Sequence, residues 1–377
     1  MAESDYTKDL NEGRIRRVVL LGDGRIGDTT FYTPLIRGLR ERLPHAEIVM
    51  VTNSYSTPVV KHNPHLNRVW SVAFKTRNPL TCWSHRKILS EVFAERFDLG
   101  IVLNRKPRLL ALLRKHRCRF TAGHAEGCEF YVPIRQDRHR IESELELARV
   151  LGCAPREPWP EVAVAPEAAR EVGAFLTAHG VGPDAPLIGI HPGCNYAVRR
   201  RRRPLERLPR RRPRHRKLWP GERFAEVARR MHEHTRLPII LTGLEQERPI
   251  LEAIAAASGV EPLLGCFRPE TLPALVARLS FLICIDSGPM HIAAARRVPL
   301  VALFGPTSSL HFGPYAPEKW VCVIRPPESV LRSADPEEVM NYLTVEAVIE
   351  KVIAHWERVG TLKHLRSSSD EIQPREP

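Results

Sequence analysis

Polar residues that could hold a diphosphate follow a short apolar run near residue 285. Phe281–Ile285 is typical of a buried strand, and the residues directly after it are Asp286, Ser287, Gly288, Pro289, Met290 and His291. Ser before a helix and Pro in its first turn are typical of a helix start. The unpaired N–H groups and positive dipole end of such a start favour phosphate. The stretch predicts an anion site, although an ordinary strand-turn-helix unit has a similar pattern.

A second donor-rich turn follows the next apolar run along the chain. Residues 299–304 read as another buried strand, and Gly305, Pro306 and Thr307 come directly after it. Two parallel strands end at the same edge of a sheet, so Thr307 and Ser287 are expected to lie on neighbouring loops. Nucleotide diphosphates bind at that edge in doubly wound sheets.

Asp28 is an acidic residue in the amino-terminal half that could do acid-base chemistry. It follows a G-x-G-x-x-G pattern at residues 22–27, between a predicted strand at 17–21 and a predicted helix at 29–42. This pattern is the dinucleotide fingerprint, but the second predicted strand, 47–51, lacks the acidic residue that would hold the ribose. A nicotinamide-dependent oxidoreductase is therefore a weaker alternative. Asp28 could cap the helix or take a proton from a hydroxyl group.

Three ordered motifs resemble glycosyltransferase family 9, the ADP-heptose:lipopolysaccharide heptosyltransferases. The segment 286–307 reads D-S-G-P-M-H-I-A-A-A and then P-L-V-A-L-F-G-P-T, similar to the nucleotide-binding signature of the family. Gly27-Asp28 followed by a T-P-L helix at 33–35 resembles its amino-terminal motif. The third match is H-P-G at 191–193 with K-L-W-P at 217–220 and F-A-E-V-A-R after it. The resemblance spans roughly residues 16–355.

The resemblance implies an α/β protein of the GT-B class, with two Rossmann-like parallel-sheet domains facing a central cleft. Residues 14–160 would bind the acceptor and residues 166–345 the nucleotide sugar, with the proline-rich stretch 155–166 as a linker. A helix at 345–359 is expected to pack back on the first domain. Residues 360–377 are expected to form a disordered tail.

The resemblance also implies inverting, metal-independent transfer of heptose from ADP-L-glycero-D-manno-heptose to the lipopolysaccharide inner core or a related anionic acceptor. Asp28 would be the catalytic base, and no cofactor is expected. The predicted nucleotide-sugar contacts are Lys217, Glu247, Asp286, Ser287, Gly288, Pro289, Met290, His291 and Thr307. Glu245 is an alternative to Glu247 beside the ribose. Lys75, Arg77 and Arg105 are predicted to contact the anionic acceptor. Another nucleotide sugar or acceptor remains an alternative.

The basic charge of the chain is concentrated in one segment. The net charge is +14, and eleven Arg and one Lys against one Glu give residues 195–217 a charge of +11. This Arg/Pro insertion, 197–216, is expected to be disordered. It would either attract anionic membrane or lipopolysaccharide phosphates or be a tolerated insertion without a function of its own. Nucleic-acid binding is disfavoured, because no aromatic residues are interleaved for base stacking.

The remaining composition predicts a cytoplasmic protein, and the resemblance together with the basic insertion implies peripheral contact at the inner face of the inner membrane. Eight cysteines are scattered without the short spacing of a metal site, which is typical of reduced thiols. The amino-terminal segment does not resemble a secretory signal, and no apolar run has transmembrane length.

Overall fold

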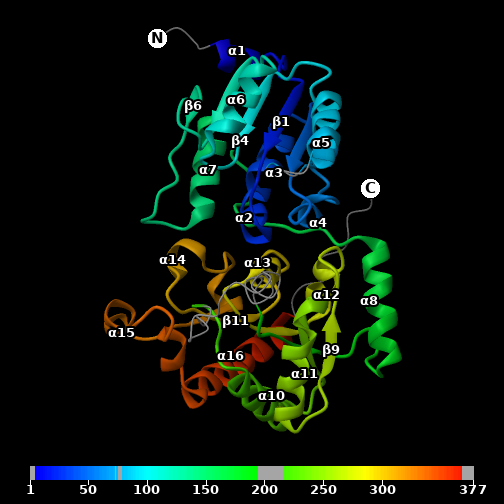
Figure 1. Cartoon of the computed structure of the whole chain (residues 1–377), viewed down its shortest axis with the longest axis vertical. Coiled ribbons are helices and arrows are strands. Elements are labelled where there is room, and N and C mark those ends of the chain that lie inside the picture. Colours follow the sequence, from blue (N-terminus) through cyan, green and yellow to red (C-terminus); the bar gives the residue numbers. More distant parts are fainter. Residues whose placement is uncertain (1–4, 73, 75–78, 194–215, 367–377) are drawn as a thin grey trace. The chain divides into compact units, whose positions relative to one another are not determined.

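The computed structural model describes residues 5–72, 74, 79–193 and 216–366, with the backbone course alone for 79–84 and 361–366. The chain divides into two units of similar size (Figure 1). The first unit comprises residues 1–171 with the short segments 269–274 and 310–315, and the second comprises the rest. The predicted Arg/Pro insertion at 197–216 lies outside the described residues except for Arg216.

The first unit is built on a six-stranded parallel sheet. Its strands are β1 (Arg17–Leu21), β2 (Glu47–Thr52), β3 (Arg68–Ser71), β4 (Leu99–Val102), β5 (Phe120–Gly123) and β6 (Phe130–Tyr131). They lie in the order β3-β2-β1-β4-β5-β6. β1 is central, and Val18, Val19, Leu20 and Leu21 have no exposed surface. Strands β1 to β3 are added toward one edge of the sheet and β4 to β6 toward the other, so the strand order reverses between β1 and β4. Doubly wound sheets bind ligands at this position.

Helices cover the first sheet. They are α1 (Asp5–Asn11), α2 (Ile26–Phe31), α3 (Thr33–Arg42), α4 (Thr57–Val60), α5 (Pro79–Val92), α6 (Pro107–Lys115) and α7 (Arg140–Val150). The single helix expected at 29–42 is wrong, because α2 and α3 are separated at Tyr32. Pro34 has no N–H to donate to the Thr30 carbonyl. The Thr33 hydroxyl donates to that carbonyl instead, at 2.8 Å.

The second unit repeats the topology of the first. Its strands are β7 (Ile188–His191), β8 (Ile239–Gly243), β9 (Leu263–Cys266), β10 (Phe281–Ile285), β11 (Leu300–Leu303) and β12 (Val321–Ile324). All pairs are parallel, in the order β12-β11-β10-β7-β8-β9. β7 and β10 therefore occupy the positions that β1 and β4 hold in the first sheet. The α/β class with two Rossmann-like sheets is confirmed.

The remaining helices follow the second half of the chain. They are α8 (Pro166–Ala178), α10 (Gly221–Thr235), η2 (Glu245–Glu247), α11 (Arg248–Ser258), α12 (Leu272–Arg278), α13 (Gly288–Ala295), α14 (Ser309–Phe312), η3 (Glu318–Trp320), α15 (Glu328–Ser333), η4 (Val339–Tyr342) and α16 (Val345–Arg366). None of the helices in the described ranges is long and apolar enough to cross a membrane.

The carboxy-terminal helix differs from its prediction in both length and packing. α16 continues to Arg366, so residues 360–366 of the expected tail are helical, while 367–377 lie outside the described residues. Its buried residues Val348, Ile349 and Val352 join the core of the second sheet rather than the first domain. These apolar side chains repeat at helical spacing and face β10, β12 and α10, which supply the matching apolar surface.

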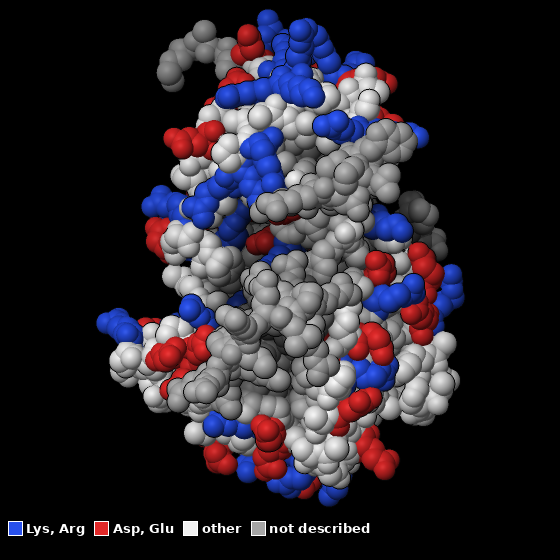
Figure 2. All heavy atoms as spheres, in the orientation of Figure 1, with Lys and Arg blue, Asp and Glu red and all other residues white. Residues whose placement is uncertain are grey.

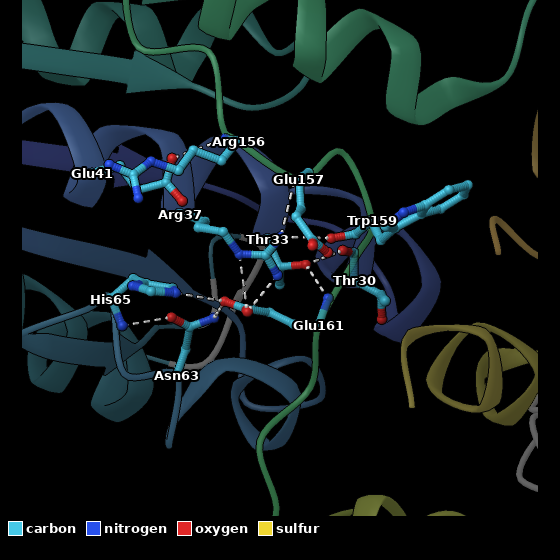
Figure 3. A network of polar contacts seen from close by, with 10 residues as sticks. All are labelled: Thr30, Thr33, Arg37, Glu41, Asn63, His65, Arg156, Glu157, Trp159 and Glu161. Atoms are coloured by element: carbon cyan, nitrogen blue, oxygen red, sulfur yellow. Dashed lines mark hydrogen bonds and ion pairs between the residues drawn. The ribbon is translucent and has the colours of Figure 1, made fainter. Parts of the chain in front are cut away.

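The proline-rich stretch before α8 is held on the first unit by a polar network (Figure 3). The Glu161 carboxylate accepts hydrogen bonds from Arg37 at 2.5 Å and from Asn63 at 3.2 Å, and it lies 3.2 Å from the ring of His65. Arg37 also donates to the carbonyl of Trp159 at 3.2 Å. Burial raises the pKa of Glu161, but His65 and Arg37 more than offset it and lower the pKa overall. Residues 155–161 are therefore an ordered part of the first unit.

The segment 310–315 comes from the connection between β11 and β12 but packs in the first unit. The ring of His139 donates to the carbonyl of Gly313 at 2.9 Å, and the Tyr315 hydroxyl donates to Glu142 at 2.5 Å. The ring of Tyr315 lies 4.8 Å from that of His139 and 5.4 Å from that of Trp159. The first unit is thus completed by residues distant in the sequence.

Candidate active site

Asp28 lies in the first turn of α2, at the carboxyl edge of the first sheet. One oxygen of its carboxylate, Oδ2, accepts the backbone N–H of Arg25 at 2.9 Å, so Asp28 does cap the helix. Among the described residues, no ion pair to Asp28 is present. The nearby Gly24 makes this arrangement sterically possible, because a Cβ on Gly24 would lie 2.7 Å from the Cβ of Asp28. Asp28 is thus a fixed carboxylate that forms no ion pair in the described chain, although it interacts electrostatically with Arg140.

Asp23 is a second acid in the same loop, but cations neutralise it. Lys106 and Arg108 each form an ion pair of 2.5 Å with its Oδ2. The ammonium of Lys106 also donates to the carbonyl of Asp23 at 2.6 Å. These contacts join the loop after β1 to the loop after β4. Asp28 rather than Asp23 is therefore the carboxylate suited to accept a proton.

A buried charged cluster supports the same edge of the sheet. Arg140 forms an ion pair of 2.7 Å with Glu144, whose carboxylate lies 3.0 Å from the ring of His124. Burial raises the pKa of Glu144, but His124 and Arg140 more than offset it and lower the pKa overall. The hydroxyl of Tyr32 lies near Gly24, and burial together with the charge of Asp28 raises its pKa. Tyr32 is consequently a neutral neighbour of Asp28.

The predicted acceptor contacts are only partly described. Lys75 and Arg77 lie outside the described residues, whereas Arg105 is exposed in the loop after β4. Arg105 begins the segment 105–119, which holds seven Lys and Arg and no acidic residue. Figure 2 shows Lys and Arg gathered over the part of the first unit where Figure 1 places α6. This surface is electrostatically suited to an anionic molecule.

The second unit brings Asp286, Lys217 and Thr307 together. The ammonium of Lys217 and the hydroxyl of Thr307 both donate to Oδ2 of Asp286, the latter at 2.7 Å. The parallel pairing of β10 with β11 confirms that the two strand ends are neighbours. Gly305 lies close to Met340 and to the residue before Lys217, since a Cβ there would lie 2.7 Å from the sulfur of Met340 and 3.2 Å from the carbonyl of Arg216. The sequence motifs predicted these three residues as nucleotide contacts, but not that Lys217 and Thr307 would both donate hydrogen bonds to Asp286.

The helix start predicted directly after β10 is present as the start of α13, with one change. Ser287 occupies the N-cap position, but its hydroxyl donates to the carbonyl of Ile285 at 3.1 Å and does not cap the helix. The side chains of Met290 and His291 are buried. Pro289 lacks an N–H, so the backbone N–H groups of Gly288 and Met290 are the donors that the first turn can offer. These donors adjoin the Asp286 carboxylate along the chain.

A third group at this edge joins the ends of β7 and β8. The ring Nδ1 of His191 lies 3.0 Å from the Thr242 hydroxyl, and burial lowers the pKa of His191 although the charge of Glu247 opposes the shift. Glu247 is buried, and its Oε2 accepts the N–H of Leu244 at 2.9 Å. Its Oε1 is buried and has no hydrogen-bond partner within the described ranges. Glu245, by contrast, is exposed and forms an ion pair with Arg248 at 2.6 Å.

Glu247 is therefore better placed than Glu245 to bind a ligand. Gly193 lies against it, because a Cβ on Gly193 would lie 2.5 Å from Oε1. The H-P-G motif was noticed in the sequence, but its contact with Glu247 and the pairing of His191 with Thr242 were not predicted. Within the described ranges, no three His, Cys, Asp or Glu side chains are grouped to hold a metal ion.

Known proteins resemble this chain in sequence. A family model for glycosyltransferase family 9 (heptosyltransferase) matches residues 132–339, which is more than half of the chain. Lipopolysaccharide heptosyltransferase 3 of Escherichia coli is 23% identical over 307 residues, covering 77% of this chain and 84% of that protein. Lipopolysaccharide heptosyltransferase 2 of Salmonella typhimurium is 23% identical over 318 residues, covering 78% of this chain and 83% of that protein.

Solved structures resemble it in fold. The glycosyl transferase family 9 protein from Veillonella parvula DSM 2008 aligns with a TM-score of 0.74 and 23% identity, covering 90% of this chain and 97% of that one. E. coli heptosyltransferase WaaC with ADP aligns with a TM-score of 0.69 and 17% identity, covering 90% and 99%. With the family model matching more than half of its length and two Rossmann-like sheets as its framework, the chain belongs to glycosyltransferase family 9, the heptosyltransferases, and is a glycosyltransferase of the GT-B fold.

Proposed function

We propose that this enzyme transfers heptose from ADP-L-glycero-D-manno-heptose to the lipopolysaccharide inner core or a related anionic saccharide. The observation that carries the proposal is the Asp28 carboxylate, which forms no ion pair in the described chain and which follows β1 of a family 9 glycosyltransferase. The names of the relatives support the acceptor class, since they are lipopolysaccharide heptosyltransferases. One solved structural neighbour contains ADP.

The proposed reaction is a single displacement that inverts the anomeric carbon. The acceptor oxygen forms a bond to that carbon as the bond from the carbon to the ADP diphosphate breaks. Asp28 takes the proton of the acceptor hydroxyl. The electron pair of the broken bond leaves with ADP, so the charge that must be stabilised develops on the diphosphate.

The second unit is proposed to stabilise this charge without a metal ion. Lys217 supplies a positive charge beside the start of α13, where the N–H groups of Gly288 and Met290 are available to phosphate oxygens. A diphosphate would take over the ammonium of Lys217 from Asp286. Oε1 of Glu247, which has no hydrogen-bond partner among the described residues, is suited to accept a hydrogen bond from a ribose hydroxyl. His291 and Thr307 complete the proposed nucleotide-sugar site.

The first unit is proposed to bind the acceptor. Arg105 is exposed beside the loop of Asp28, and Lys75 and Arg77 are proposed as further contacts to acidic groups of the acceptor. We place the enzyme in the cytoplasm at the inner face of the inner membrane. The Arg/Pro insertion, 197–216, would contribute attraction to anionic lipid there, roughly 1 kcal/mol per basic residue near the surface.

Calorimetric titration with ADP, GDP, UDP and NADH, without added metal, tests the donor. Selective ADP binding is expected, followed by transfer from ADP-heptose to a heptose-deficient lipopolysaccharide core in the presence of a chelator. Preference for GDP or UDP would replace the donor but retain the transferase. Loss of transfer with the chelator, restored by a divalent cation, would contradict the metal-independent mechanism.

A further inference from the structure

Asn104 lies at the carboxyl edge of the first sheet, immediately beyond β4. The N–H of Leu103 donates to the carbonyl of Leu21 at 3.0 Å, continuing the pairing of β4 with β1. Asn104 is the next residue, so its backbone adjoins the start of the loop that carries Asp28. This is the crossover position of the sheet, where ligands of doubly wound folds bind.

The side-chain amide of Asn104 has no hydrogen-bond partner among the described residues. Its nitrogen and its oxygen are both buried, and neither makes a hydrogen bond. No other described side chain has two buried polar atoms that both lack a hydrogen-bond partner. Burying an amide without hydrogen bonds costs free energy, so such a group calls for an explanation. The complementary partner must both donate and accept a hydrogen bond.

Asn53 provides a direct comparison, because it follows β2, which lies on the other side of β1 from β4 in the same sheet. Its amide nitrogen donates to the carbonyl of Gly24 at 2.7 Å, and its oxygen accepts the N–H groups of Tyr55 and Ser56, each at 3.1 Å. Asn53 is thus a structural residue that holds the loop after β1. Of the two asparagines at this edge of the sheet, the side chain of Asn53 is hydrogen-bonded and that of Asn104 is not.

The backbone on both sides of Asn104 is held in place. The guanidinium of Arg140 donates to the carbonyl of Leu103 at 3.1 Å, and Lys106 binds the carbonyl and carboxylate of Asp23. Arg140 is itself fixed by its buried ion pair with Glu144. Arg140 and Lys106 therefore hold the backbone on both sides of Asn104. The side-chain amide of Asn104 itself makes no hydrogen bond to the described residues.

We propose that Asn104 binds hydroxyl groups of the acceptor saccharide and is a specificity-determining residue of the acceptor site. This inference rests on the proposed function, in which the first unit binds the acceptor. A primary amide offers one acceptor oxygen and two donor hydrogens, which match two neighbouring hydroxyls of a sugar ring. The cations of this edge recognise the charge of the acceptor, whereas an uncharged amide reads its hydroxyl pattern.

The test compares Asn104→Leu with Asn53→Leu in the full-length enzyme. Each variant is measured by thermal unfolding without ligand and by steady-state transfer with the acceptor varied at saturating ADP-heptose. Asn104→Leu is expected to keep or raise the melting temperature, because an apolar group replaces an unpaired amide. It should lower kcat/KM for the acceptor about tenfold and leave the KM for ADP-heptose unchanged. Asn53→Leu is expected to lower the melting temperature.

Asn104→Ala is measured beside these variants, since it introduces no bulk that could block the site. A similar loss of acceptor kcat/KM in Asn104→Ala supports the inference. A wild-type acceptor kcat/KM in Asn104→Ala, or a melting temperature of Asn104→Leu as low as that of Asn53→Leu, would overturn it. If the wild-type enzyme transfers no heptose to any lipopolysaccharide core, the proposed function fails and this inference fails with it.

Discussion

The central strands of the two sheets end in loops of different chemistry, although the strand order is the same. In the first unit, Asp23 after β1 is neutralised by Lys106 and Arg108 after β4. In the second, Asp286 after β10 holds the single cation Lys217 and the hydroxyl of Thr307. The first arrangement fixes a loop, and the second holds one positive charge that an incoming diphosphate can compete for. Topology determines where a ligand can bind, and the pairing of charges determines which chemistry is available.

Replacing Asp28 tests the first half of this comparison and should have the largest effect. Asp28→Asn is expected to lower kcat about 1,000-fold, because the amide cannot take the proton of the acceptor hydroxyl. ADP affinity measured by calorimetry should change little. Asp23→Asn is the matched control, since it removes an acid of the same loop that is already paired. A larger loss of kcat in Asp23→Asn than in Asp28→Asn would reverse the assignment of the base.

Replacing Lys217 tests the second half of the comparison, the ion pair between Lys217 and Asp286. Lys217→Ala is expected to lower kcat about 100-fold and to weaken ADP binding, because the charge on the departing diphosphate loses its cationic partner. Asp286→Asn removes the competing anion and keeps a hydrogen-bonding group of the same shape. It should leave ADP affinity equal or tighter. If Asp286→Asn weakened ADP binding as much as Lys217→Ala, Asp286 would be required to position Lys217 rather than to compete with the diphosphate.

Gly193 allows a finer test of the nucleotide site. Gly193→Ala is expected to weaken ADP binding about tenfold, because the new Cβ would lie 2.5 Å from the Glu247 oxygen and displace it. Gly173→Ala on α8 is the control, since a Cβ there meets no atom within 4 Å. Calorimetry on both variants measures the difference. Equal ADP affinity in the two variants would remove Glu247 from the ribose site.

The smallest expected effect concerns pH and the first unit. Burial lowers the pKa of His139 to about 4, below its ordinary value of 6.5. As the pH falls from 6.5 to 4, the unfolded chain binds a proton that folded His139 does not, so stability decreases through this range. This shift in the pKa of His139 corresponds to a change of about 3 kcal/mol at most in the free energy of unfolding. His139→Gln keeps an N–H donor toward Gly313 and should flatten this part of the melting-temperature profile. An unchanged profile would show that other histidines dominate it.

Much of the framework could be predicted from local sequence patterns. Apolar runs such as Phe281–Ile285 bury every residue, and the strand bounds at β1 and β10 agree with their predictions. The neighbouring positions of Asp286 and Thr307 were also predicted, because parallel strands end at a common edge. The roles of these residues in binding and catalysis stay predictions.

The sequence could not reveal which charges would pair across long separations. Asp23 and Asp28 look equivalent by residue type alone, and the structure distinguishes them because Lys106 and Arg108 lie beside Asp23. Asn104 looks like an ordinary loop residue in the sequence, and only the structure shows that its amide has no hydrogen-bond partner in the described part of the chain. The α16 prediction was wrong because an apolar helical stripe indicates that a helix is buried, but not which sheet buries it.

The docking of Tyr315 and Gly313 in the first unit has a consequence for synthesis on the ribosome. The chain of the first unit is made up to residue 171 well before residues 310–315 are added. At about 5–20 residues per second, this interval is on the order of ten seconds. Throughout it, His139 and Glu142 lack the partners that they hold in the finished protein. The amino-terminal unit therefore cannot reach its final packing as the chain emerges, and a nascent chain halted before residue 310 would expose an incomplete surface to chaperones and proteases.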